Sequence, residues 1–249
     1  MNRLQTRAQT LLNPSKKRIP LVDKPLSLDF PHRLFTPEKY EAGYDYPLII
    51  WLHSHNSSEY ELDGVMPHLS LRNYVALAIR GPQVSRANDR RFQWGKTPSA
   101  MALSEELILQ AMDATSNKLS INRRKIFLMG HGEGGTLAQW LGLRHSQRIA
   151  GVVSIHGGFP HRAKCLTQWK RARSLPVLFM YGERSELCDT DEVCRSLCHV
   201  HSAGLSYHFA QFPTGDDLDT SMADTANRFM MELVVGQASS SNTEAASFR

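Results

Sequence analysis

Five short apolar runs, separated by segments with helical periodicity, constrain the fold of this chain more than any other feature. Continuous apolar runs of this length are typical of strands buried on both faces, as in a parallel sheet. A sixth segment alternates in polarity and is expected near an edge of the sheet. The sequence therefore predicts an α/β fold with a doubly wound, mostly parallel sheet. The six segments cover residues 47–53, 74–79, 125–130, 150–155, 176–182 and 205–212.

The segments between the apolar runs fit crossover helices. One helix is expected over residues 97–118, with Thr97 or Ser99 as its N-cap. A second is expected over residues 190–204, and a last helix from about 218 to 235. The first helix is expected to bury four apolar side chains at helical spacing, Leu103, Leu107, Ile108 and Met112.

Residues 26–47, which precede the first apolar run, are expected to add an N-terminal antiparallel extension. They resemble a pair of strands closed by turn residues, and Pro31 and Pro37 suit an edge position.

The chain divides into three parts by composition. With 249 residues and 41% hydrophobic content, it can bury the core of one α/β domain, expected over residues 21–236. Residues 1–20 form a basic N-terminal segment. Residues 237–249 are polar and low in complexity, so a disordered tail is expected there.

Charge and hydropathy exclude several classes of protein. The net charge of +5 comes from scattered basic clusters without interleaved aromatic residues, so we expect a solvated surface and no nucleic-acid partner. No apolar stretch approaches the roughly 18 residues of a membrane span. The N-terminal segment lacks the apolar core of a secretory signal, which favours a cytoplasmic location with reduced cysteines. The four cysteines are expected to be buried thiols rather than metal ligands: Cys165, Cys188, Cys194 and Cys198.

The segment "KIFLMGHGEGGTLAQWLGL" runs from a strand through a glycine-rich turn into a helix. The apex of such a turn projects over the carboxyl ends of the parallel strands, where α/β sheets bind their ligands. The residue at this apex is Gly132, which has no side chain. The turn therefore has the shape expected of a reactive site without a reactive group.

The order of elements, together with the stretches "GHGEGG" and "LPVLFMYGERSE", resembles the phospholipase/carboxylesterase group of the α/β-hydrolases over about residues 28–236. In that family the turn reads G-x-S-x-G and presents a serine nucleophile; here Gly132 takes that position. The family's acid lies in a G-x-x-D pattern and its base in P-x-G-H. The matching positions carry Ser185 and Asp216, and no histidine follows His208.

The resemblance also implies a change at the oxyanion hole. The family has an H-G-x-G loop after its first buried strand, whereas this chain has "HSHNSS", with Ser54 in place of the first glycine. A side chain disfavours the positive φ that glycine adopts there. The second oxyanion-equivalent position, after the apex, is Glu133. Because a Ser-His-Asp triad acts as one unit, these differences imply a hydrolase fold that lacks triad catalysis.

Further polar side chains follow the strand ends and are candidates for lining a pocket. Imidazoles and carboxylates together are common zinc ligands, but polar lining of a vestigial pocket is the interpretation we favour, with no metal and no cofactor. A displaced nucleophile is the alternative, in which Ser54, Ser185 or Cys188 reacts with a nearby histidine as base. The lining candidates are His53, His55, His131, His156 and Glu186.

Two functions follow from these residues. The first hypothesis is a non-catalytic module, a pseudohydrolase, that binds an unidentified small molecule or protein partner. The alternative is an active carboxylic-ester or thioester hydrolase with a displaced nucleophile. The oligomeric state cannot be predicted from these motifs.

Overall fold

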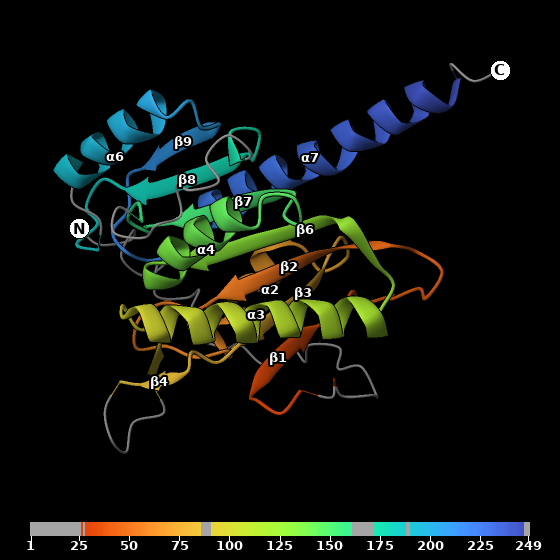
Figure 1. Cartoon of the computed structure of the whole chain (residues 1–249), viewed down its shortest axis with the longest axis horizontal. Coiled ribbons are helices and arrows are strands. Elements are labelled where there is room, and N and C mark those ends of the chain that lie inside the picture. Colours follow the sequence, from red (N-terminus) through yellow and green to blue (C-terminus); the bar gives the residue numbers. More distant parts are fainter. Residues whose placement is uncertain (1–25, 27, 86–90, 161–171, 188–189, 247–249) are drawn as a thin grey trace, which may run out of the picture.

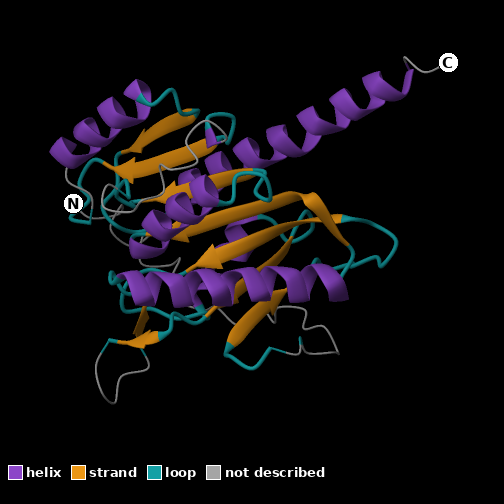
Figure 2. Cartoon of the chain, in the orientation of Figure 1, coloured by secondary structure: helices purple, strands orange, loops and turns teal. Residues whose placement is uncertain are grey.

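The computed structural model describes residues 26, 28–85, 91–160, 172–187 and 190–246. Seven strands form one sheet with helices on both faces (Figures 1 and 2). The strand order is β1-β3-β2-β6-β7-β8-β9, and every neighbouring pair except β1 with β3 is parallel. The predicted doubly wound, mostly parallel α/β sheet is confirmed.

Each apolar run of the sequence coincides with a strand, and the alternating sixth segment forms the edge strand β9. The strands of the main sheet are β1 (His32–Phe35), β2 (Tyr46–Leu52), β3 (Val75–Ile79), β6 (Ile121–His131), β7 (Gly151–Ile155), β8 (Val177–Gly182) and β9 (Tyr207–Phe212). A separate ribbon pairs β4 (Gln83–Val84) with β5 (Phe92–Gln93). The helices are α2 (Glu61–Leu69), α3 (Pro98–Lys118), α4 (Glu133–Arg144), α6 (Thr190–Ser202) and α7 (Thr220–Ala246).

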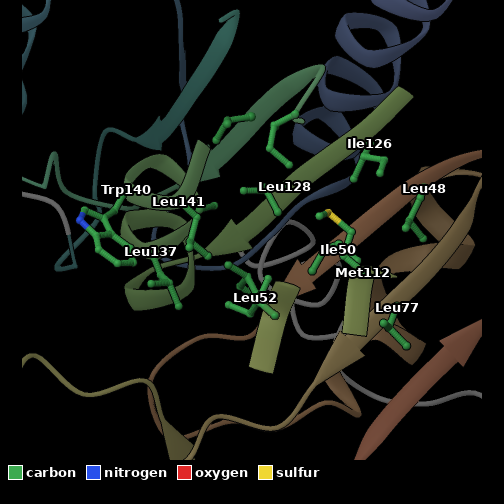
Figure 3. Close-up of a cluster of buried hydrophobic side chains, with 14 of the residues drawn as sticks. Leu48, Ile50, Leu52, Leu77, Met112, Ile126, Leu128, Leu137, Trp140 and Leu141 are labelled. Atoms are coloured by element: carbon green, nitrogen blue, oxygen red, sulfur yellow. The ribbon is translucent and has the colours of Figure 1, made fainter. Parts of the chain in front are cut away.

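The sheet buries both faces, which explains the continuous apolar runs. In β2, Leu48, Ile50 and Leu52 contribute to one core with α3 and α4 (Figure 3). Ile49 and Trp51 contribute to a second core, on the opposite face, with α2 and α7. Successive side chains of a strand point to opposite faces. Because a core covers each face of the sheet, all seven residues of β2 are buried. Burial of each large apolar side chain contributes roughly 1.5–3 kcal/mol to folding.

The N-terminal extension is antiparallel, as predicted, but its partner differs from the prediction. The sequence suggested a pair of strands within residues 26–47, whereas β1 pairs antiparallel with β3, from His32 opposite Ile79 to Phe35 opposite Ala76. A two-stranded hairpin alone is only marginally stable in water. Pairing with β3 instead makes β1 part of the seven-stranded sheet.

Helix α3 confirms part of the expected pattern. Its N-cap is Thr97, whose side chain accepts a backbone hydrogen bond in the first turn. Ile108 and Met112 are buried as expected, but the prediction for Leu103 is wrong, since this side chain is 44% exposed. The buried stripe of α3 runs through Ser104 and Ile108, which places Leu103 on the outer side.

The last helix is longer than predicted. Helix α7 begins at Thr220 and continues to Ala246, through most of the segment 237–249 that was expected to be disordered. The sequence after Gly236 is rich in serine and alanine and contains no proline, so no strong helix breaker follows this glycine. In Figure 1 the C-terminal part of α7 extends away from the sheet.

The expected burial of the cysteines is wrong for the two that can be examined. Cys194 and Cys198 are free thiols exposed on α6. The side of α6 that packs against the sheet carries Val193 and Leu197 instead. Cys165 and Cys188 lie outside the described residues, as does the basic segment 1–20. None of the helices in the described ranges combines the length and the apolar composition that crossing a membrane requires.

Helix α4 packs so closely against the end of β2 that no side chain fits between the two backbones at Gly134. A Cβ placed on Gly134 would meet the carbonyl oxygen of Leu52 and would lie 2.6 Å from that of His53. Backbone atoms of Gly134 likewise occupy the space of a Cβ on Gly130. Glycine at these positions therefore allows the strand, the turn and the helix to stack closely.

We expect Gly134→Ala to lower the free energy of unfolding by about 3 kcal/mol or more, because the added methyl group overlaps backbone atoms that cannot rotate away. Chemical denaturation measures this loss. Gly43→Ala is the matched control, since nothing lies within 4 Å of the added Cβ there. Equal stability of the two variants would contradict the close packing of α4.

Candidate functional site

The predicted apex of the turn between β6 and α4 lies at the carboxyl edge of the sheet. Gly132 has φ 53° and ψ −117°, a conformation that residues with a side chain rarely adopt. Its amide donates a hydrogen bond to the carbonyl of Ile155 at 2.8 Å, and its carbonyl accepts one from the amide of Thr136 at 3.1 Å. The sharp turn is therefore held from β7 on one side and from α4 on the other.

The apex has room for a side chain. A Cβ on Gly132 would lie 3.5 Å from Cδ1 of Leu187 and 4.0 Å from Cβ of Ser54, both ordinary contacts. Leu187, which the sequence reasoning missed, is therefore the nearest side chain above the apex. In the sequence, only the position of Leu187, two residues after the expected acid position, could have indicated this role.

The positions matched to the acid and the base lie in contact. The hydroxyl of Ser185 donates to Oδ1 of Asp216 at 2.5 Å, and the amides of Leu187 and Glu186 donate to the same carboxylate at 3.1 and 3.3 Å. Burial opposes the ionisation of Asp216, but these three hydrogen bonds outweigh it and lower the pKa of the carboxyl group. Asp216 is thus an anion that holds the loop after β8.

The sheet explains why these two loops meet. Strands β8 and β9 are parallel neighbours whose register ends at Gly182 opposite Phe212, so the loops that follow them leave the sheet side by side. The amide of Arg184 donates to the carbonyl of Thr214 at 3.0 Å, which joins the loops directly. Proximity of residues 185 and 216 therefore follows from strand order.

Two histidines lie beside Asp216. Nε2 of His131 is 2.8 Å from the carbonyl oxygen of Asp216 and 3.2 Å from Nδ1 of His156. A carbonyl oxygen only accepts, so Nε2 of His131 carries the proton of that bond. His156 is 1% exposed and has φ 52°. Burial, reinforced by His131, lowers the pKa of His156 to about 4, so its ring is neutral and a weak base near pH 7.

The amide of Ser54, expected at the oxyanion-equivalent position, is already engaged. It donates to Oε2 of Glu61 at 3.0 Å, and the Ser54 hydroxyl donates to Oε1 at 2.7 Å. Nε1 of Trp51 donates to the same carboxylate at 2.9 Å. Sequence reasoning missed Glu61, because no motif marks it. The Glu61 carboxyl group thus occupies the amide that the family resemblance assigns to the oxyanion hole.

His53 lies in the protein interior. Its side chain is fully buried, Nε2 accepts a hydrogen bond from the amide of Gly81 at 2.9 Å, and Nδ1 lies 2.8 Å from the carbonyl of Ser54. Burial lowers the pKa of His53, so the neutral ring fixes the backbone on both sides. The residue supports the loop after β2 rather than facing a ligand.

The remaining candidates lie near the apex, beside Glu133 and Asp216. Nδ1 of His55 is 3.3 Å from Oε2 of Glu133, and the amide of Trp94 donates to the same oxygen at 3.3 Å. Glu186 is exposed and contacts Asp216 through its backbone amide. No group of three histidine, cysteine or acidic side chains in the described ranges is arranged to hold a metal ion.

Known proteins match this arrangement at the level of family and fold. A family model described as Phospholipase/Carboxylesterase matches residues 83–232, which is more than half of the chain. No curated protein matches the sequence significantly.

Solved structures with a similar fold share little sequence identity with this chain. SOBER1 from Arabidopsis thaliana has a TM-score of 0.66 at 17% identity, and the match covers 76% of this chain and 99% of that one. A carboxylesterase from Mesorhizobium loti gives 0.66 at 15% identity over 86% and 99% of the two chains. A carboxylesterase from Bacillus cereus gives 0.64 at 16% identity over 83% and 96%. The likeness confirms the α/β-hydrolase type of fold.

We expect Gly132→Ala to lower the free energy of unfolding by about 1–3 kcal/mol, because alanine resists the backbone conformation of the apex while its methyl group has room. Equilibrium denaturation measures the change. Gly236→Ala is the control, since nothing lies within 4 Å of its Cβ and its φ is not positive. Unchanged stability of Gly132→Ala would mean that the turn relaxes to ordinary geometry in solution.

Proposed function

This chain belongs to the phospholipase/carboxylesterase family of α/β-hydrolases, and because its triad positions carry Gly132, Ser185 and Asp216, we propose that it is a non-catalytic ligand-binding or protein-interaction module. The alternative, an ester or thioester hydrolase with a displaced nucleophile, is the function against which the proposal is tested.

The hydrogen bond between Ser185 and Asp216 is the observation that carries the proposal. It places the residues matched to the acid and the base in contact, next to the loop that covers the apex. This contact supports the assignment of Ser185 and Asp216 to the acid and base positions of the family. Gly132 has no nucleophile, and an ionised Asp216 does not relay a proton near pH 7 as an imidazole does.

The hydrogen bonds of the candidate serines weigh against a displaced nucleophile. A hydroxyl has one proton to donate, and those of Ser54 and Ser185 point to the carboxylates of Glu61 and Asp216. Carboxylates, with an ordinary pKa near 4, are much weaker bases than imidazole, so this pairing leaves the hydroxyls unactivated. The third candidate, Cys188, lies outside the described residues.

The charges near the apex favour one class of ligand. Asp216 is ionised at neutral pH, and Glu133 and Glu61 place two more carboxyl groups near the apex. In a partly buried site these groups repel carboxylates and oxyanions. We therefore propose that the bound group is neutral or cationic, in contrast to the oxyanions formed during ester hydrolysis.

We expect the purified protein to remain unlabelled by a fluorophosphonate probe and to hydrolyse p-nitrophenyl esters no faster than a heat-inactivated sample. The physical reason is the absence of an activated hydroxyl at the elbow. Intact-mass spectrometry detects the probe adduct, and absorbance follows the ester. Stoichiometric labelling of one serine, lost on its replacement by alanine, would establish the alternative function and locate its nucleophile.

Restoring the three groups together provides a second test. We expect Gly132→Ser, Ser185→Asp and Asp216→His in one protein to give weak but measurable ester hydrolysis, because positions 185 and 216 are already within hydrogen-bond distance. A misplacement of about 1 Å costs on the order of 100-fold, and the engaged amide of Ser54 withholds oxyanion stabilisation worth roughly 3–4 kcal/mol.

The double variants that lack one of the three changes are the matched controls and are expected to be inactive. Adding Ser54→Gly and Glu61→Gln to the triple variant is expected to raise its rate, because the amide is then released and the nearby negative charge is removed. Activity in the unmodified protein that survives Gly132→Ala would contradict this assignment of roles.

A further inference from the structure

The two edges of the main sheet are built differently. At one edge, β1 has four residues, lies between Pro31 and Pro37, and carries Arg33, whose guanidinium pairs with Asp63 at 2.7 Å. Short length, proline and charge are the usual means by which proteins prevent edge strands from pairing with another chain. This edge is therefore protected.

Strand β9, at the opposite edge, has none of these features (Figure 1). Its sequence, YHFAQF, contains no proline, lysine, arginine or acidic residue. All six residues pair with β8 in one uninterrupted register, so no bulge twists the strand away. The outer side of β9 is thus a regular six-residue edge.

The hydrogen bonds to β8 define which backbone groups point outward. The amide of Val177 donates to the carbonyl of Ser206 at 3.0 Å, and that of Glu183 donates to Phe212 at 2.8 Å. The even-numbered residues of β9 therefore face β8, and the odd-numbered ones face away. Among the residues that the structure describes, the backbone N–H and C=O groups of Phe209 and Gln211 have no hydrogen-bond partner.

Phe209 gives this edge an apolar centre. Its ring stacks on Phe179 with centroids 5.8 Å apart and lies 5.2 Å from the ring of Tyr181. The side chain nevertheless remains 40% exposed. The aromatic cluster of β8 and β9 therefore ends in an open ring at the middle of the free edge.

We propose that two copies of this chain associate through antiparallel pairing of their β9 strands about a two-fold axis at Phe209. Because the outward-facing residues are odd-numbered, Phe209 forms a hydrogen-bonded pair with the partner's Phe209. Tyr207 then lies opposite the partner's Gln211. The two Phe209 rings share one face, on which they extend the aromatic cluster across the interface, and the two sheets join into one.

A second copy suits this edge because the strand is self-complementary. A two-fold interface brings each residue against its own symmetry mate or a fixed partner, so any lysine or carboxylate near the axis would face a like charge. β9 carries no such residue. A foreign peptide strand would gain the same backbone bonds, whereas a second copy always places a ring against Phe209, because the axis passes through this residue.

Sedimentation velocity of the full-length protein at micromolar concentration tests the proposal. The wild-type protein is expected to sediment as a dimer, and Phe209→Lys as a monomer with an unchanged far-UV circular dichroism spectrum. Val84→Lys is the matched control, since Val84 is an exposed apolar residue of the separate ribbon, and it is expected to remain dimeric. A monomeric wild-type protein, or a dimer that persists in Phe209→Lys, would overturn the proposal.

A charge exchange tests the register itself. Phe209→Lys and Phe209→Glu are each expected to be monomeric, because like charges meet at the axis. Their equimolar mixture is expected to dimerise, since lysine then faces glutamate. This dimerisation should be lost at high salt, which screens the attraction. This result also shows that both variants are folded. A mixture that stays monomeric, while both variants keep the wild-type spectrum, would rule out pairing at Phe209.

Discussion

The backbone contact between α4 and the end of β2 is the constraint on which the rest of the candidate site depends. Gly134 allows the helix to approach the carbonyl groups of Leu52 and His53 without an intervening side chain. This approach leaves the chain only a sharp turn between β6 and α4, which places Gly132 in a backbone conformation suited to glycine. The apex therefore keeps the shape of a nucleophile elbow independently of any chemistry performed there.

The shape of this site and the chemistry of the family depend on different atoms. The shape rests on backbone packing and on strand order, which bring the loops after β8 and β9 together. The chemistry of the family rests on three side chains, and here the same positions make a structural clamp. Asp216 accepts hydrogen bonds from Ser185 and from two amides, and so holds Leu187 over the apex. The base position thus carries a carboxylate in a polar contact, where the family has an imidazole.

The candidate site and the free edge at β9 follow from the same parallel sheet but serve different purposes. Parallel strands collect polar loops at their carboxyl ends, where a ligand is bound. The sheet also has two edge strands, β1 and β9, which differ in length and charge. β1 is short and charged at one end, whereas β9 is regular and uncharged at the other. The proposed ligand site, in the loops at the carboxyl ends of the strands, and the proposed dimer edge, along β9, therefore involve different residues and can be tested by separate mutations.

Much of the fold and part of the site could be predicted from the sequence alone. Apolar runs identify strands because burial on both faces is a local property, and the sequence itself shows Asp216 where the family pattern has its histidine. The partner of β1, the outward position of Leu103 and the capture of Ser54 by Glu61 could not be predicted. These features depend on which segments meet and at what angle, and only the packed tertiary structure decides that.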